Sequence, residues 1–251
     1  MKRGAMKTIC LLACIVLALA AGAAHAFQAN GLITPYQVVN VGSPQIGVLA
    51  TVNFDRGDSV KKGEVVATLH SSVEKAAMEL KRAQKEFAQR KLERMNPLYR
   101  KDVIAANDMD EAQTERALAE ADYRYSAEIV KRLEIRSTID GVVVERYMAP
   151  GEYVENRPIL KLAQVDPLCV EVILPSEMYA TVTVGMKAEV FPEKPVGGRH
   201  EAVVSIVDRV IDAASGTFGV RLTMPNPEHA VPAGLKCMVE FPGQAKAEAA
   251  F

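Results

Sequence analysis

The stretch SSVEKAAMELKRAQKEFAQRKLERMNPLYRKDVIAANDMDEAQTERALAEADYRYSAEIVKRL, residues 71–133, decides the fold of this chain. It is rich in Ala, Glu, Lys, Arg and Leu, which are strong helix formers. The helical pattern is interrupted once, between Asn96-Pro97 and Asn107. Segments on both sides of the stretch alternate like β-strands. We therefore predict that residues 71–134 form an α-helical hairpin pushed out of a β-sandwich.

Apolar and small residues recur every three or four positions in both predicted helices, which indicates one seam along each helix. The first seam is Val73, Ala76, Leu80, Ala83 and Phe87, and the second is Met109, Ala112, Arg116, Ala119, Tyr123, Ser126, Val130 and Leu133. Because alanine dominates, a two-helix antiparallel coiled coil with these seams would bury little apolar surface. We expect it to gain stability by packing against neighbours, which indicates self-assembly into a homo-oligomer.

The predicted helix ends carry capping and charge signals. Ser71 followed by Glu74 predicts a capping box at the first helix, and Asn107 is the predicted N-cap of the second. Three pairs four residues apart are expected to form ion pairs on the exposed faces. They are Glu86 with Arg90, Glu120 with Arg124, and Glu128 with Arg132.

The flanking segments predict two β domains. Residues 38–70 and 135–165 contain short valine-rich runs, separated by turns in which we assign structural roles to Gly57, Gly63, Gly141 and Gly151. Residues 166–242 contain short strands at the spacing of a small β-barrel, followed by a tail, 243–251. The predicted fold class is mostly β with an inserted helical hairpin, in an elongated multi-domain chain.

The N-terminus predicts export. Residues 1–26 combine a basic start, an apolar run and the small residues of Ala24-His25-Ala26, as in a signal peptide cleaved after Ala26. A retained N-terminal anchor and a lipid anchor at Cys14 are the alternatives. The full chain has a formal charge of -1, and loss of the three cations in residues 1–26 makes it more negative. This balance argues against nucleic acid as a partner.

No pattern of catalytic, cofactor-binding or metal-ligating residues is present. The histidines that follow the predicted signal peptide, His70, His200 and His229, lack ligand spacing, and neither a nucleophile elbow nor a phosphate loop occurs. We predict no cofactor and no enzymatic activity. Strand alternation places Cys237 on an apolar face and Cys169 on the wetter face shared with Glu171, so two free thiols are expected.

The two β segments that flank the hairpin carry a family resemblance. The run from Gly57 to Leu69 resembles the first half-motif of biotinyl/lipoyl-type domains, and the run from Asp140 to Leu162 resembles the second. A carrier domain needs a lysine in the turn between its halves. Here the strand at Leu69 runs into the helix instead, so the resemblance implies a lipoyl-like β-sandwich without the carrier function.

The predicted hairpin tip resembles that of periplasmic adaptor proteins, the membrane fusion proteins of the HlyD type in tripartite efflux systems. In that family an Arg, a Leu four residues on and a Ser seven further on engage the outer-membrane channel. Arg94 and Leu98 match, and Ala105 stands where the pattern has Ser. The resemblance implies that these three positions bind the channel. It also extends to the barrel segment, implying a six-stranded type of β-barrel.

The resemblance implies an efflux-pump adaptor, located in the periplasm and associated with the inner membrane. Its partners would be an inner-membrane transporter of the resistance-nodulation-division (RND) type, an outer-membrane channel and further copies in a ring. Many relatives carry a membrane-proximal domain, which we expect to be absent because only residues 243–251 follow the barrel. The alternatives are an adaptor of an ATP-driven exporter or type I secretion system, a lipoyl or biotinyl carrier, and a structural coiled-coil protein.

Overall fold

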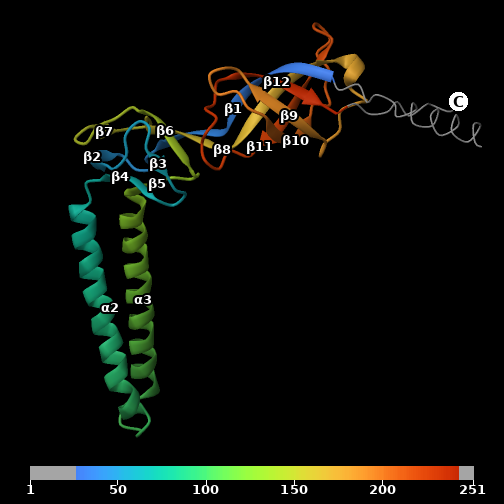
Figure 1. Ribbon diagram of the computed structural model, residues 1–251. Coiled ribbons are helices and arrows are strands. Elements are labelled where there is room, and N and C mark those ends of the chain that lie inside the picture. The colour runs from blue at the N-terminus through green and yellow to red at the C-terminus, as the bar shows by residue number, and fades with distance from the viewer. Residues whose placement is uncertain (1–26, 243–251) are drawn as a thin grey trace, which may run out of the picture. The chain divides into compact units, whose positions relative to one another are not determined.

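A computed structural model describes residues 27–242 (Figure 1). The predicted signal peptide, residues 1–26, and the predicted tail, residues 243–251, lie outside the described residues. The chain forms two compact units, one of residues 37–164 and one that joins the strand before residue 37 to the residues after 164. The chain passes between the units within two long strands, β1 (Phe27–Gly42) and β8 (Pro158–Pro175).

The unit after residue 164 is a six-stranded antiparallel barrel. Its strands follow the order β1-β12-β9-β10-β11-β8, and an additional pairing of β1 with β8 closes the circle. The strands not yet introduced are β9 (Lys187–Pro192), β10 (His200–Val207), β11 (Thr217–Met224) and β12 (Lys236–Phe241). Closure leaves no unpaired sheet edge to recruit other strands. The prediction of a six-stranded barrel is confirmed.

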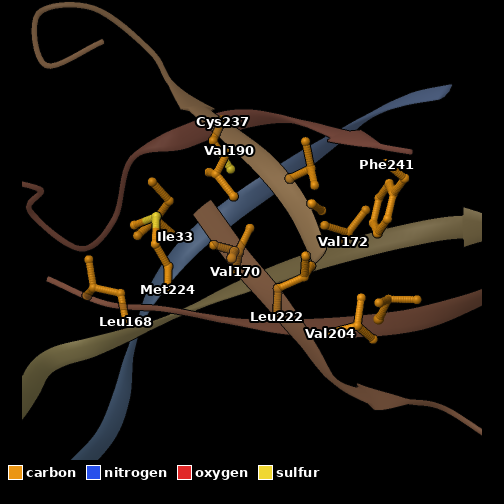
Figure 2. Packing of buried hydrophobic residues seen from close by; sticks show 14 of the residues in the cluster. Ile33, Leu168, Val170, Val172, Val190, Val204, Leu222, Met224, Cys237 and Phe241 are labelled. Carbon is orange, nitrogen blue, oxygen red and sulfur yellow. The ribbon is translucent and has the colours of Figure 1, made fainter. Parts of the chain in front are cut away.

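Alternate residues of the strands fill the barrel interior (Figure 2). On β8, the inward set is Leu168, Val170, Val172 and Leu174, each at most 1% exposed. Successive residues of a strand point to opposite faces, so this spacing of two directs one apolar side chain per pleat into the core. Phe218 and Phe241 are the largest side chains of this core.

Both described cysteines are free and buried. Cys237 belongs to the barrel core, as predicted. Cys169 lies outside that core, on the strand face that it shares with Glu171, as predicted. That face is exposed at Ile173, which is 70% exposed, but Cys169 itself is covered and only 2% exposed. Alternation fixes the face of a residue but not what covers it, and Cys169 lies close to Arg221 and Glu171. Burial raises the pKa of the Cys169 thiol, opposed by the Arg221 guanidinium, and raises the pKa of Cys237 to about 11.

A buried asparagine ties the end of β11 to the loop before β12. The side-chain nitrogen of Asn226 donates to the carbonyls of Val165 and Val231 at 2.9 and 3.0 Å, and its oxygen accepts from the Val231 N–H at 3.1 Å. Asn226 is 4% exposed. One side chain thus satisfies three main-chain groups that would otherwise need other partners.

The unit of residues 37–164 contains a β-sandwich and the helical hairpin. Its six short strands are β2 (Gly47–Val52), β3 (Ser59–Val60), β4 (Val65–Leu69), β5 (Glu134–Arg136), β6 (Gly141–Arg146) and β7 (Tyr153–Val154). One sheet has the order β5-β4-β2-β7, while β3, β6 and β8 pair in the other. Residues from before and after the hairpin share one apolar core, which includes Leu49, Val66, Ile135 and Leu162.

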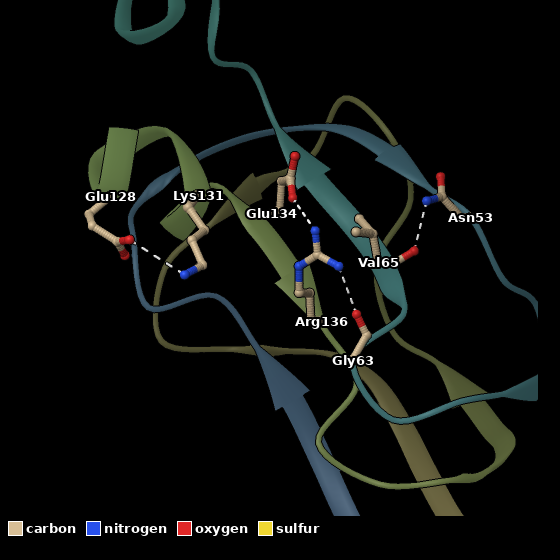
Figure 3. Close-up of polar contacts among 7 residues, drawn as sticks. All are labelled: Asn53, Gly63, Val65, Glu128, Lys131, Glu134 and Arg136. Carbon is tan, nitrogen blue, oxygen red and sulfur yellow. Dashed lines mark hydrogen bonds and ion pairs between the residues drawn. The ribbon is translucent and has the colours of Figure 1, made fainter. Parts of the chain in front are cut away.

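The hairpin is inserted between two strands that are neighbours in the sheet. β4 pairs with β5 in an antiparallel register that sets Val65 opposite Arg136 and Thr68 opposite Glu134. The Arg136 guanidinium strengthens this junction by donating to the Gly63 carbonyl at 2.7 Å and pairing with the Glu134 carboxylate at 2.6 Å (Figure 3). The two sequence halves therefore meet directly at the base of the hairpin.

The four glycines assigned to structural turns serve two different purposes. Gly57, Gly63 and Gly151 have φ values of +96°, +85° and +92°, a region that side chains other than hydrogen disfavour. Gly141 instead permits a close approach of strands. A Cβ atom at this position would lie 2.3 Å from the carbonyl oxygen of Ala163 on β8.

Gly141→Ala is expected to lower the free energy of unfolding by about 2 kcal/mol or more, because the obstructing atom is backbone and a whole strand must move. Gly47→Ala is the matched control. There the new Cβ would meet Leu69 side-chain atoms at 3.5 Å, an ordinary contact, so a change within about 0.5 kcal/mol is expected. Urea unfolding of both variants measures the difference. Equal stability of the two would contradict the close-approach explanation.

Candidate functional site

The hairpin consists of α2 (Ser72–Tyr99) and α3 (Ala106–Arg132), which run antiparallel. Three ion pairs join the helices: Lys81 to Asp122 at 2.7 Å, Lys85 to Glu120 at 3.1 Å, and Lys91 to Glu115 at 2.6 Å. These side chains are partly exposed, so each pair stabilises the hairpin by less than about 1 kcal/mol. They also fix the register of the hairpin, that is, which residues of α2 and α3 lie at the same height along its long axis.

The predicted seam of α3 faces inward, with Met109 and Ala112 buried, but the predicted seam of α2 was wrong. Val73, Leu80 and Phe87 are 75%, 60% and 53% exposed. The more covered side of α2 instead carries Met78, Lys81, Lys85, Ala88, Leu92 and Met95.

The reason lies in the long lysine side chains, whose aliphatic stems cover apolar surface while the ammonium groups reach acids of α3. The ammonium of Lys85 also lies 4.8 Å from the centre of the Tyr123 ring. The prediction from sequence periodicity treated these lysines as polar surface residues, so it placed the seam of α2 on the other face of the helix.

The helix ends also differ from the prediction. Ser71 is the N-cap residue of α2, but its side chain makes no capping hydrogen bond. Asn107 lies inside α3, and the N-cap is Ala105, whose N–H donates to the Asp108 carboxylate at 3.2 Å. The interruption starts later than predicted, because α2 continues through Pro97. In the last turn, a proline removes only one helical hydrogen bond.

One of the three predicted ion pairs within a helix is present, between Glu86 and Arg90 at 3.8 Å. In the other two predicted pairs, the glutamate forms an ion pair with a different cation. Glu120 pairs with Lys85 across the hairpin and with Arg116, and Glu128 pairs with Lys131. The cross-helix partner of Glu120 could not be inferred from spacing along one helix.

The chain reverses at the tip through a defined helix-ending motif. The N–H of Val103 donates to the Leu98 carbonyl, and the N–H of Asp102 donates to the Tyr99 carbonyl, both at 2.9 Å. Asp102 has a φ of +54°. This combination is a Schellman motif with Asp102 in the left-handed position. The tip is therefore an ordered turn, held by backbone hydrogen bonds.

The three predicted docking residues lie at this tip and are all exposed. Arg94 and Leu98 are one helical turn apart and share a face of α2, whereas Ala105 lies beyond the turn, where α3 begins. Among residues 27–242, the Arg94 guanidinium has no hydrogen-bond or ion-pair partner. Leu98 is 42% exposed. The tip thus presents a free cation beside an apolar side chain.

Two further exposed apolar residues lie at the tip and were not predicted from the sequence. Tyr99 is 42% exposed and Val103 is 64% exposed, so both extend the apolar surface around Leu98. The available signal was the density of apolar residues in a tight turn, where polar residues are usual.

No group of three or more His, Cys, Asp or Glu side chains within residues 27–242 could hold a metal ion. In the same range, no helix combines the length and apolar character needed to cross a bilayer.

Comparison with known protein families matches residues 37–164 to the CzcB-like barrel-sandwich hybrid domain. The matched range coincides with the compact unit that carries the hairpin, and it covers just over half of the chain. The chain belongs to the CzcB-like family. Both half-motifs described above, residues 57–69 and 140–162, lie within the matched range.

Curated relatives extend the similarity of this CzcB-like chain beyond that domain. The cobalt-zinc-cadmium resistance protein CzcB of Cupriavidus metallidurans is 26% identical over 213 residues, covering 78% of this chain and 41% of that protein. The multidrug resistance protein MdtA of Escherichia coli is 26% identical over 227 residues, covering 80% of this chain and 54% of MdtA. The chain spans about half the length of the curated relatives it matches.

Solved structures share the fold of the CzcB-like chain. A MacA-MexA chimera containing the Pseudomonas aeruginosa MexA α-hairpin domain has a TM-score of 0.72 at 18% identity, covering 87% of this chain and 82% of the chimera. The membrane fusion protein Spr0693 of Streptococcus pneumoniae has a TM-score of 0.64 at 16% identity, covering 87% and 100%. The predicted fold class and family resemblance are confirmed.

Proposed function

We propose that this chain is the periplasmic adaptor of an efflux pump, bridging an inner-membrane transporter and an outer-membrane channel. The observation that carries the proposal is the hairpin tip. It presents Arg94, which has no ion-pair partner in the described part of the chain, beside exposed Leu98 on an ordered turn, in a chain of the CzcB-like family. Its work is binding and assembly, without bond chemistry.

The chemistry of the tip defines the surface that it would recognise. Leu98, Tyr99 and Val103 offer an apolar patch, and Arg94 offers a charge that can pair with a carboxylate. A partner that supplies an apolar pocket rimmed by an acid would desolvate the patch and satisfy the guanidinium. We assign this partner as the channel. Ala105 removes one hydroxyl from the contact pattern of the family.

The remaining parts of the proposal follow from the family. An N-terminal signal peptide delivers the chain to the periplasm, where copies form a ring associated with the inner membrane. Relatives named for cobalt-zinc-cadmium resistance and for multidrug resistance support an exporting transporter, which we assign to the RND type. On this proposal, the transporter and not this chain determines which compound is exported.

Crosslinking from the tip tests the proposal. A photoreactive amino acid at position 98 of the full chain, in intact cells of the source organism, is expected to capture an outer-membrane channel protein that mass spectrometry identifies. The matched control carries the same group at Val210, a barrel residue that is 81% exposed. Capture of the channel equally from both positions, or from neither, would overturn the proposal.

A further inference from the structure

The hairpin carries two exposed apolar stripes that it does not use internally. The α2 stripe is Val73, Ala76, Leu80, Ala83 and Phe87, and the α3 stripe is Leu118, Ala121 and Tyr125. Leu118 and Tyr125 are 64% and 71% exposed, similar to Leu80 and Phe87. Both stripes have the alternating spacing of three and four residues with which one helix packs along another.

The cross-helix ion pairs place the two stripes at matching heights. Lys81 stands opposite Asp122 and Lys91 opposite Glu115. Both helices rise about 1.5 Å per residue in opposite directions. Counting from these pairs puts Leu80 at the height of Tyr125 and Phe87 at the height of Leu118, within about one residue. Ala83 and Ala121 then also share a height.

The stripes lie on opposite flanks of the hairpin. At about 100° per residue, each stripe is turned roughly 130–145° away from the covered side of its own helix. Viewed from the tip, the rotation from the covered side to the stripe is clockwise on one helix and counter-clockwise on the other, because the helices are antiparallel. The α2 stripe therefore faces one flank of the hairpin and the α3 stripe faces the other. Both also tilt toward the same side of the hairpin. A row of copies that pack flank to flank therefore curves, and such curvature is what closure into a ring requires.

Charges beside the stripes are complementary. Arg124 precedes Tyr125, and within residues 27–242 its guanidinium forms no ion pair. Glu79 precedes Leu80 and stands at the height of Arg124. Helical geometry places both charges on the same edge of their stripes. Among the described residues, the Glu79 carboxylate has a single ion-pair contact, at 3.4 Å to Arg82 within its own helix.

We propose that the α2 stripe of one copy packs against the α3 stripe of the next copy at equal height. Leu80 then meets Tyr125, Phe87 meets Leu118, and Glu79 faces Arg124. The occupant of each stripe is a second copy of this chain, and the contact is heterologous, so each copy uses one flank on each side. This interface rests on the proposed adaptor ring and gives that ring its residues.

Paired cysteines test the register. The full chain carrying both Leu80→Cys and Tyr125→Cys, oxidised in intact cells, is expected to give a ladder of dimers, trimers and larger species on a non-reducing gel. The mismatched control combines Leu80→Cys with Leu118→Cys, which differ in height by about 10 Å. It is expected to give roughly tenfold less product, because a disulfide needs Cα atoms within about 7 Å. Buried Cys169 and Cys237 do not compete.

Other outcomes would overturn the interface. Dimers from Leu80→Cys alone would show that like stripes pair, and equal ladders from matched and mismatched pairs would remove the register. If cysteine substitution itself disturbs packing, Arg124→Glu provides a second test. It should reduce an amine-reactive crosslinked ladder, which the added Glu79→Arg should restore. If the crosslinked ladders are absent while position 98 still captures the channel, the proposed interface is rejected. The proposed adaptor function is then unaffected.

Discussion

Leu98→Asp is expected to reduce capture of the outer-membrane channel by roughly tenfold or more. A carboxylate buried in an apolar contact costs more than the 1.4 kcal/mol that corresponds to a tenfold loss of affinity. The measurement uses a photoreactive group at Val103, which is 64% exposed on the same turn, so position 98 is free to vary. Arg94→Asp should have a similar effect by reversing the charge that the acceptor surface meets.

Both substitutions should leave the protein folded. Leu98 and Arg94 are exposed, so the expected change in unfolding free energy is within about 1 kcal/mol. Arg132→Asp, at the opposite end of the hairpin, is the charge-matched control and should retain capture. Undiminished capture by either tip variant, with protein abundance unchanged, would contradict docking through these residues.

Asn226→Leu is expected to lower the free energy of unfolding of the barrel unit by about 3–5 kcal/mol. The substitution removes three hydrogen bonds, leaving the Val165 carbonyl and both main-chain groups of Val231 without their partner. Each buried group left unsatisfied costs about 1–3 kcal/mol, only partly offset by the added apolar surface.

Urea unfolding monitored by circular dichroism measures this effect. Asn226→Asp keeps an acceptor for the Val231 N–H but cannot donate to the two carbonyls, so it should also destabilise the barrel. Asn30→Ala, at an exposed position of β1, is the control and should change stability by less than about 0.5 kcal/mol. A loss below about 1 kcal/mol for Asn226→Leu would refute the anchoring role.

The architecture was predictable because its signals are local or repeated. Glycine-containing turns separate the short strands, and the long helical stretch between Leu69 and Ile135 indicates that a hairpin is inserted into the β domain. The orientation of α2 was not predictable in the same way. Two interleaved patterns of three and four residues compete on that helix, and the choice depends on where the Lys81 and Lys85 ammonium groups find acids on α3.

The candidate site was predicted only in part for a related reason. Arg94 and Leu98 could be found by their fixed spacing on one helix. The contribution of Val103 depends on a turn in which Asp102 adopts a left-handed conformation, which its sequence favours only weakly. Likewise, Cys169 is only 2% exposed although it lies outside the barrel core, and alternation along β8 does not predict that burial.

The direct pairing of β4 with β5 makes the hairpin a replaceable module. The sandwich is hydrogen-bonded beneath the insertion, so its register does not depend on how long the helices are. Removing seven residues from each helix would shorten the arm by about 10 Å and keep the coiled-coil phase. The similar MacA-MexA chimera carries the hairpin domain of another protein. Evolution can therefore adjust the length of the arm to the distance it must span without redesigning the domain that bears it.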